Sequence, residues 1–183
     1  MRFIEGFLSP AEADRWLQRL YRADWIKWQR ETFSIYGKEV QAPRSLAWFG
    51  DRGMNYRYTG LDHFTQGWPE ELCRLKEQVE QAAGQRFNFL LLNRYENGGE
   101  HMGWHRDDEK GCSSNIASLS IGAPRRFAID CDELPNIGGK RQENYELGEG
   151  ALLIFDGRQR HCLRPTKKSC GTRINLTFRQ ITA

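Results

Sequence analysis

The chain has 183 residues, of which 28% are charged, and its formal net charge is only +3. This length and composition fit one soluble globular domain spanning 1–183. The small net charge says little about partners: a basic face could still bind phosphates, but the average charge does not require one. No stretch approaches the roughly 20 apolar residues of a membrane span, and the first residues lack the apolar segment of a signal peptide. We therefore expect a cytoplasmic, monomeric protein without membrane contact. The five cysteines form no Cys-x-x-Cys pair, which argues against a disulfide framework or a structural zinc site.

Two helices are expected in the first half of the chain. Residues 9–12 (Ser-Pro-Ala-Glu) have the pattern of a capping box with proline at the first helical position, and the helix that they open should run to about Arg22. A second helix is predicted to start near Pro69 and to end at Gly84. The segment 25–58 between them has hairpin character, with basic residues interleaved among aromatic ones.

Most of the remaining sequence is predicted to form strands. Short runs of aliphatic, aromatic and β-branched residues are bounded by Gly, Pro or Asn. These runs are residues 87–95, 116–121, 126–131, 144–147, 151–155 and 173–181. Two helices followed by about eight strands, without βαβ alternation, predict an α+β protein. The expected architecture is an antiparallel jelly roll with both helices packed on one sheet.

His105 and Asp107 are candidate metal ligands. Side chains two residues apart on an extended backbone point to the same side, so both can reach one ion. His161, just after an expected strand, is a candidate third ligand. Two histidines and one carboxylate on one face of a metal leave the other positions open, as non-haem Fe(II) oxygenases require. The same spacing also arises by chance in ordinary turns and surface pairs.

The last predicted strand alternates polar and apolar residues. Its polar residues, which share one face, are Arg173, Asn175, Thr177 and Arg179. Such a face normally points to solvent. If it points into a jelly roll instead, its fixed arginines suit a dicarboxylate, because a guanidinium meets a carboxylate with two parallel hydrogen bonds. Asn93 and Tyr95 have the same spacing twelve residues before the first candidate ligand.

From about Pro43 to Ile181, the sequence resembles the AlkB-type dealkylating dioxygenases. The resemblance rests on residues 93–95 (Asn-Arg-Tyr), 103–109 (Gly-Trp-His-Arg-Asp-Asp-Glu), 116–122, 125–127, 150–153 with His161, and 173–179. The last of these, Arg-x-Asn-x-Thr-x-Arg, is highly specific to that family. The resemblance implies a double-stranded β-helix core.

The resemblance also implies the catalytic chemistry. Fe(II) would be held by His105, Asp107 and His161, with 2-oxoglutarate and O2 as co-substrates. The residues expected to bind 2-oxoglutarate are Asn93, Tyr95 and Arg173 at its distal carboxylate, Arg179 near its metal-bound end, and Thr177 as a lesser contact. The implied reaction is oxidative demethylation of N-alkylated bases in DNA, of the 1-methyladenine and 3-methylcytosine type, coupled to decarboxylation of 2-oxoglutarate to succinate.

Within that family, the sequence is most similar to the branch that repairs duplex DNA, and residues 24–60 would form a nucleotide-recognition lid. Tyr36 stands where this branch carries the aromatic tip of a base-probing finger hairpin, which fills the gap left by a flipped base. A plain surface hairpin is the alternative. Tyr58 would stack on the damaged base with Tyr56 supporting it, although a tyrosine at either position could equally belong to the core.

Asp108 and Glu109 directly follow the metal carboxylate. In the family, acids at this place approach the exocyclic amine of the alkylated base, which suits a cationic lesion. A solvated turn is the alternative interpretation. Two rival functions also remain open. One is the same chemistry on RNA, a protein or a small molecule, since nothing in the chain reads a 2′-hydroxyl. The other is a catalytically silent jelly roll that binds nucleic acid.

Overall fold

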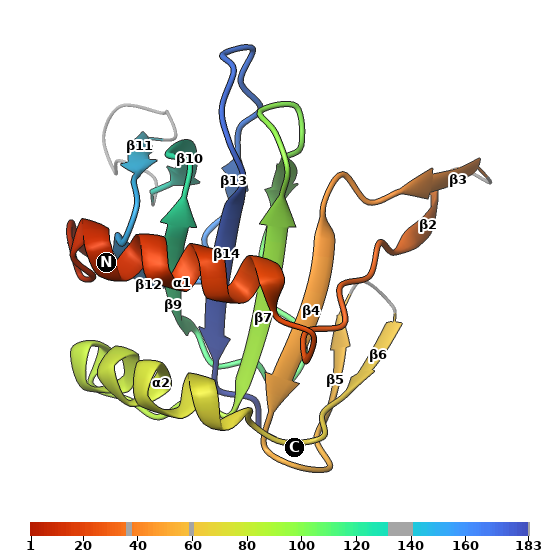
Figure 1. Cartoon of the computed structure of the whole chain (residues 1–183). Helices are drawn as coiled ribbons and strands as arrows, with labels where there is room; N and C mark the ends of the chain where they lie inside the picture. Colours follow the sequence, from red (N-terminus) through yellow and green to blue (C-terminus); the bar gives the residue numbers. More distant parts are fainter. Residues whose placement is uncertain (36–37, 59–60, 132–140, 183) are drawn as a thin grey trace.

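The structure, a computed structural model, describes residues 1–35, 38–58, 61–131 and 141–182. Two antiparallel sheets form its centre (Figure 1). The large sheet has the order β1 (Arg2–Ile4), β12 (Leu152–Asp156), β9 (Asn115–Gly122), β14 (Arg173–Arg179), β7 (Phe89–Tyr95) and β4 (Ser45–Gly50). The small sheet has the order β11 (Gln142–Leu147), β10 (Arg125–Asp130), β13 (His161–Leu163) and β8 (Met102–His105).

Both helices cover the same face of the large sheet, as the sequence predicts. Helix α1 (Pro10–Arg22) begins with the expected capping box, in which the Ser9 hydroxyl and the Glu12 carboxylate bond each other's backbone N–H. Helix α2 (Glu70–Ala83) ends at Gly84, whose φ of 70° is the left-handed conformation that glycine adopts without strain. Fully buried leucines from both helices and from the sheet form one core, which holds the helices on that face. The predicted α+β class is thus confirmed.

β14 lies in the middle of the large sheet, between β7 and β9. All seven of its residues are buried. The apolar side chains of Ile174, Leu176 and Phe178 pack in the core under the helices. The polar face therefore points the other way, into the space between the two sheets, where water is largely excluded. The interior interpretation of this alternating strand is the one that the fold adopts.

The prediction that strands come mainly after the second helix was incomplete. β1 and β4 precede α2 and belong to the large sheet, and two hairpins lie between the helices. β1 has three residues and β8 has four, too few for a two-residue period to be recognised in the sequence. β4 lies within the segment for which only hairpin character was expected. In the described part of the chain, no helix is long and apolar enough to cross a membrane.

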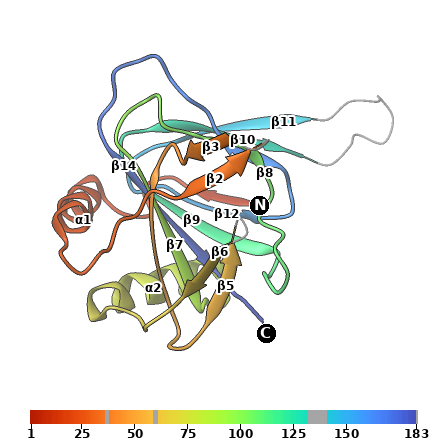
Figure 2. The same ribbon diagram turned by 90° about the vertical axis from the view of Figure 1, so that its right-hand side faces the viewer.

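The hairpins are β2 (Thr32–Ile35) with β3 (Lys38–Gln41), and β5 (Asn55–Tyr58) with β6 (Leu61–Phe64). Each forms a two-stranded sheet of its own. They lie on the β4 side of the large sheet, and Figure 2 views the molecule from that side. Hairpin β2–β3 lies within the segment 24–60 that the sequence predicts to be a lid, and hairpin β5–β6 begins in that segment and extends beyond it to Phe64.

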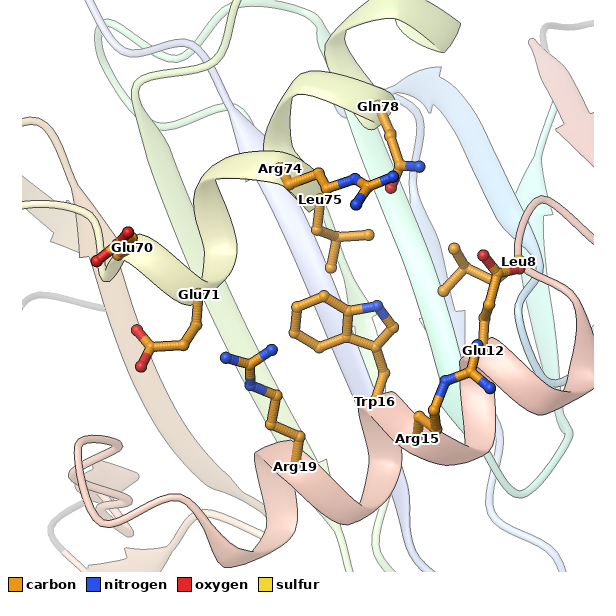
Figure 3. A pocket seen from close by; sticks show the side chains of 10 residues that line it. All are labelled: Leu8, Glu12, Arg15, Trp16, Arg19, Glu70, Glu71, Arg74, Leu75 and Gln78. Atoms are coloured by element: carbon orange, nitrogen blue, oxygen red, sulfur yellow. The ribbon is translucent and has the colours of Figure 1, made fainter.

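A cleft of about 630 Å³ separates the two helices (Figure 3). Trp16 of α1 points toward Leu75 of α2 there, and arginines and glutamates of both helices line the rim. The cleft lies on the helix side of the large sheet. Within the described residues, the group of side chains with metal-ligand geometry lies on the opposite side of that sheet, between the two sheets.

Candidate metal centre and 2-oxoglutarate pocket

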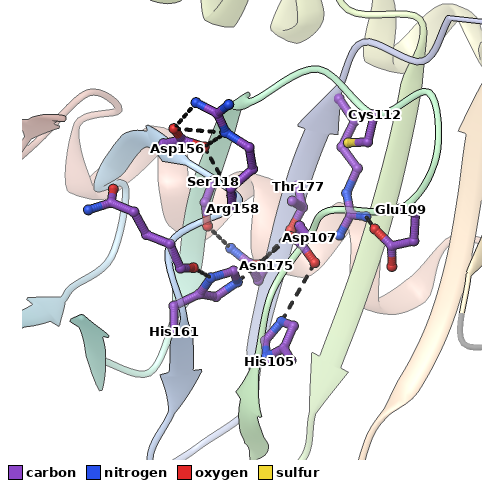
Figure 4. A network of polar contacts seen from close by, with 12 residues as sticks. His105, Asp107, Glu109, Cys112, Ser118, Asp156, Arg158, His161, Asn175 and Thr177 are labelled. Carbon is purple, nitrogen blue, oxygen red and sulfur yellow. Dashed lines mark hydrogen bonds and ion pairs between the residues drawn. The ribbon is translucent and has the colours of Figure 1, made fainter. Parts of the chain in front are cut away.

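His105, Asp107 and His161 come together between the sheets (Figure 4). One ligand atom from each of them lies within 4.8 Å of the others. The backbone produces this arrangement, because His161 of β13 is the cross-strand partner of His105 at the end of β8. Asp107 follows two residues later and is fixed by its N–H, which donates to the Gly157 carbonyl at 2.8 Å.

Both imidazole rings are oriented for metal binding. His105 Nδ1 donates to the Gly103 carbonyl and His161 Nδ1 donates to the Gln159 carbonyl, each at 2.8 Å. A proton fixed on Nδ1 leaves Nε2 with its lone pair available, which is how protein scaffolds orient metal-binding histidines. The two Nε2 atoms each lie 3.7 Å from a different oxygen of Asp107.

The protonation states of the three candidate ligands also suit metal binding. Burial, reinforced by the neighbouring His161, lowers the pKa of His105 to about 4, and burial lowers the pKa of His161 as well. Both rings are therefore neutral near pH 7, the form that binds metal. Burial would raise the pKa of Asp107, but the positive charge of Arg179 and its hydrogen bond to the carboxylate outweigh burial and hold that pKa below its ordinary value. Asp107 is thus an ionised carboxylate.

A divalent cation fits this site. Asp107 is buried, with 3% of its side chain exposed, and its Oδ1 has no hydrogen-bond partner among the described residues. A buried carboxylate oxygen without a partner is costly unless a cation binds it. Two imidazoles and one carboxylate are the donor set that non-haem Fe(II) oxygenases use.

The same pocket contains the residues that the sequence predicts for 2-oxoglutarate. Besides the three candidate metal ligands, its polar lining includes Asn93, Tyr95, Arg173, Asn175, Thr177 and Arg179. Arg179 donates to Asp107 Oδ2 at 2.9 Å, so this end of β14 contacts the candidate metal centre directly. The apolar lining comes from both sheets, with Leu91 on β7 and Phe127 on β10 among its members. Strand parity, together with the resemblance to the AlkB-type dioxygenases, therefore predicted a set of residues that the fold gathers in one cavity.

Arg173 is the residue that most clearly requires a ligand. It is 2% exposed, and its guanidinium contacts the Ser120 hydroxyl at 2.8 Å and the face of the Tyr95 ring. Its Nε lacks a hydrogen-bond partner, and within the described residues no carboxylate pairs with it. Burial lowers the pKa of Arg173 to about 10. A buried cation of this kind is stabilised by a carboxylate that enters the pocket.

Tyr56 and Glu109 also adjoin the centre. The Tyr56 hydroxyl donates to Glu109 Oε2 at 2.7 Å and accepts a hydrogen bond from Arg179 Nη1. Because Tyr56 is only 2% exposed and packs on Phe89, it fits the supporting position predicted for it better than direct stacking on a base. Burial raises the pKa of Tyr56 far above its ordinary value, so the hydroxyl keeps its proton.

The other substrate residues predicted from the sequence are less well defined. Tyr36 lies outside the described residues. For Tyr58 the structure describes the backbone, as the last residue of β5 paired with Leu61. Asp108 is exposed, whereas Glu109 is half-buried and turned toward Arg179. Of the two acids, Glu109 is therefore the one that the fold connects to the metal centre.

Sequence reasoning missed the residues that hold the pocket's polar side chains in place. Ser118 and Ser120 of β9 accept hydrogen bonds from Asn175 and Arg173, both at 2.8 Å. Arg44 donates to Asn93 Oδ1 at 2.9 Å. The alternation of serine with apolar residues in β9 was a signal for the first two, since it has the same parity as β14. No sequence signal pairs Arg44 with a residue 49 positions away.

Comparison with known proteins agrees with this geometry. The sequence profile of the 2OG-Fe(II) oxygenase superfamily matches residues 1–179. "DNA oxidative demethylase ALKBH2" is 36% identical in Bos taurus, where the match covers 94% of this chain and 66% of the relative. The Homo sapiens protein of that name is 35% identical, with 94% and 70% covered. "Alpha-ketoglutarate-dependent dioxygenase alkB homolog 3" of Homo sapiens is 32% identical, with 96% and 64% covered. The chain thus spans about two thirds of the length of these relatives.

Solved structures share the fold. The chain described as "The structure of OsALKBH1" superposes with a TM-score of 0.64 at 15% identity, covering 98% of this chain and 97% of that one. A 2OG-Fe(II) oxygenase family protein from Burkholderia pseudomallei gives a TM-score of 0.63 at 14% identity, with 97% and 84% covered. The chain therefore belongs to the 2OG-Fe(II) oxygenase superfamily and, within it, to the AlkB-type dioxygenases that depend on Fe(II) and 2-oxoglutarate.

Proposed function

We propose that this protein oxidatively demethylates N-alkylated bases of the 1-methyladenine and 3-methylcytosine type in DNA, and that it converts 2-oxoglutarate to succinate in the process. The observation that carries the proposal is the shared pocket. A carboxylate–imidazole metal centre and a buried arginine without a carboxylate partner line the same cavity. The relatives named DNA oxidative demethylase support DNA as the substrate.

In this proposal the metal ligands are His105, Asp107 and His161. Fe(II), when bound, supplies the oxidation of the N-alkyl carbon by O2, which no side chain can perform. The protein contributes neutral imidazoles, an ionised carboxylate and a cavity buried between two sheets. Arg179 contacts Asp107 Oδ2, and Oδ1, which has no hydrogen-bond partner among the described residues, would bind the ion.

The 2-oxoglutarate site would be built from the polar face of β14 and its neighbour β7. Arg173 would bind the distal carboxylate, because its guanidinium is buried and its Nε has no partner. Asn93 and Tyr95 would contact the same carboxylate. Thr177 would be a lesser contact, since its hydroxyl already donates to Asn175 at 2.9 Å. Arg179 would lie near the metal-bound end.

The substrate side would be formed by the lid, residues 24–60, and by the acids after Asp107. Glu109 suits a cationic base, because a carboxylate at the edge of the pocket offsets the positive charge of the lesion. Tyr56 would orient Glu109 through its hydroxyl. Tyr58 would stack on the base, Asp108 would approach it from the solvent side, and Tyr36 would probe the duplex.

The test is incubation with Fe(II), 2-oxoglutarate, ascorbate and oligonucleotides that carry one methylated base. Single-stranded DNA, duplex DNA and RNA are compared, and mass spectrometry follows the loss of a methylene unit. We expect DNA to be demethylated with succinate formed in step. Activity on RNA alone, or on none of the oligonucleotides, would refute the proposal.

The duplex-probing role of Tyr36 has its own test. Tyr36→Ala should reduce repair of duplex DNA more than repair of single strands. Only in a duplex does the flipped base leave a gap in the base stack for an aromatic side chain to fill. Equal losses on the two substrates would show that Tyr36 does not act as a finger.

A further inference from the structure

In the described part of the chain, no strand pairing joins the two hairpins of the predicted lid to each other. Hairpin β2–β3 and hairpin β5–β6 are separate two-stranded sheets. An isolated two-stranded hairpin is marginally stable in water. If both hairpins are to present residues to one substrate, side-chain contacts must fix their relative position.

A buried ion pair provides such a contact. Glu31 Oε1 and His63 Nε2 lie 2.7 Å apart, with 7% and 1% of the two side chains exposed. Glu31 directly precedes β2, and its carbonyl accepts the Ala42 N–H at 2.8 Å, which closes the base of the first hairpin. His63 lies in β6, in the middle of the second hairpin. The pair therefore joins one hairpin to the other.

Further contacts fix the position of the His63 ring. Its Nδ1 faces the Tyr56 carbonyl at 3.2 Å, and its ring meets the Trp48 ring edge-on at a centroid distance of 4.4 Å. Both ring nitrogens face oxygen atoms, so the ring is held from two sides, by the Glu31 carboxyl group and by the Tyr56 carbonyl. Glu31 Oε2 is buried without a hydrogen-bond partner among the described residues, so this carboxyl group depends on its contact with His63. Buried pairs of this kind can select one arrangement of the elements that carry them.

The pair is also connected to the metal centre through Tyr56. Tyr56 is the cross-strand partner of His63. Its hydroxyl contacts Glu109 and Arg179, and Arg179 binds the candidate metal ligand Asp107. A displacement of β6 would therefore move Tyr56 relative to the edge of the pocket where the substrate base is expected.

We propose that Glu31 and His63 are positioning residues, which lock the two lid hairpins together and set Tyr56 for the nucleic-acid substrate without taking part in iron or 2-oxoglutarate binding. This inference rests on the proposed function for the identity of the substrate. It predicts a separation between two measurable activities. Demethylation of an oligonucleotide should need the pair, whereas 2-oxoglutarate turnover in the absence of nucleic acid should not.

The experiment compares wild type with Glu31→Leu, His63→Leu and the double variant. Each single variant leaves one member of the pair buried without its partner and should raise the KM for a methylated oligonucleotide about tenfold, the factor that corresponds to ~1.4 kcal/mol. The double variant should be less impaired than the product of the two single effects, because it removes both members of the pair together. Uncoupled succinate formation and the KM for 2-oxoglutarate should stay within about twofold of wild type, well below the effect on the oligonucleotide.

Glu80→Gln is the matched control. Glu80 is another buried carboxylate, 6% exposed, that pairs with Lys76 and Arg86 on the helix side of the large sheet. Its loss should lower the melting temperature and leave the KM for the oligonucleotide unchanged. Should the leucine variants fail to fold, Glu31→Gln keeps the side-chain volume and removes only the charge, and it should still raise the same KM.

The outcomes separate the two proposals. If wild type demethylates no oligonucleotide, the proposed function fails and this inference fails with it. If wild type is active and the Glu31 and His63 variants match it, only the inference is overturned. A parallel fall of demethylation and uncoupled succinate formation would also overturn it, since that pattern indicates a general loss of folded protein.

Discussion

The pocket between the sheets and the lid beside them are built in different ways. Every pocket residue on β14 lies on a strand that is hydrogen-bonded on both sides, with Arg173 paired to Tyr95 on β7 and to Gly122 on β9. The lid hairpins are two-stranded, and side chains such as the Glu31–His63 pair connect them. The backbone thus fixes the pocket that we propose for iron and 2-oxoglutarate, whereas side-chain contacts join the two hairpins that we propose for the substrate. Perturbations of the two halves should have separable effects.

The largest effect is expected from removing a metal ligand. His161→Ala takes away a neutral imidazole that is 3% exposed and leaves Asp107 facing a gap. We expect uncoupled succinate formation and demethylation to fall together by more than the about 10–100-fold that is typical for losing a group that merely supports a metal ligand. Fe(II) binding, measured anaerobically by calorimetry, should weaken in parallel. Full Fe(II) affinity in the variant would exclude His161 as a ligand.

Next in size is the loss of the buried arginine. Arg173→Leu should raise the KM for 2-oxoglutarate about 10–100-fold, since a hydrogen bond to a charged group contributes roughly 1.5–3 kcal/mol. Arg173→Lys should recover only part of the loss, because an ammonium cannot meet a carboxylate with two parallel hydrogen bonds. Initial rates of succinate formation over a range of 2-oxoglutarate concentrations provide the measurement. An unchanged KM in the leucine variant would place the co-substrate elsewhere.

These residues were predictable for a physical reason. A strand has a two-residue period, so the order of side chains in the sequence states which ones share a face. The resemblance to the AlkB-type dioxygenases placed the strand 173–179 inside, and parity then put Arg173, Thr177 and Arg179 on one face. The fold pairs this strand with β7 and so brings that face into one cavity with Asn93 and Tyr95. Both helices and the jelly-roll class followed from capping and periodicity in the same way.

No comparable sequence pattern predicts the contacts of the predicted lid. Its contacts join residues that are distant in the sequence and differ in type, such as Glu31 with His63 and Tyr56 with Glu109. No local period encodes these pairs, so they emerge only when the chain has folded. The sequence therefore predicted that 24–60 forms a lid and named Tyr56, but it did not predict the ion pair that joins the two hairpins.

Gly157, next to the candidate metal centre, allows a milder test of how the backbone positions Asp107. A Cβ at Gly157 would lie 2.4 Å from Ile116 Cδ1 and 3.0 Å from the Asp107 carbonyl oxygen, so in Gly157→Ala the Ile116 side chain must move and Asp107 must shift by a few tenths of an ångström. We expect uncoupled succinate formation to fall about tenfold and stability to drop by about 1–3 kcal/mol, the range for overpacking a core.

Gly148→Ala is the control for that variant, because a Cβ there would have nothing within 4 Å. Its stability should change by no more than about 0.5 kcal/mol, as for most surface substitutions. Thermal unfolding and succinate formation are measured on both variants. If Gly157→Ala behaves like Gly148→Ala, the position of Asp107 does not depend on the close approach of the two backbones.

The mildest variant probes the boundary between the two regions. Tyr56→Phe keeps the ring that packs on Phe89 at a centroid distance of 4.7 Å and removes only the hydroxyl that contacts Glu109 and Arg179. Because Arg179 still binds Asp107, uncoupled succinate formation should remain above about half of the wild-type rate, since the variant breaks one hydrogen bond and leaves the metal centre intact. Glu109 loses its fixed donor, so demethylation should fall several-fold, the effect of about 1 kcal/mol. Equal losses in both assays would assign Tyr56 to the metal half. The boundary between the two regions would then lie at His63, on the strand opposite Tyr56, and the lid would act on the substrate alone.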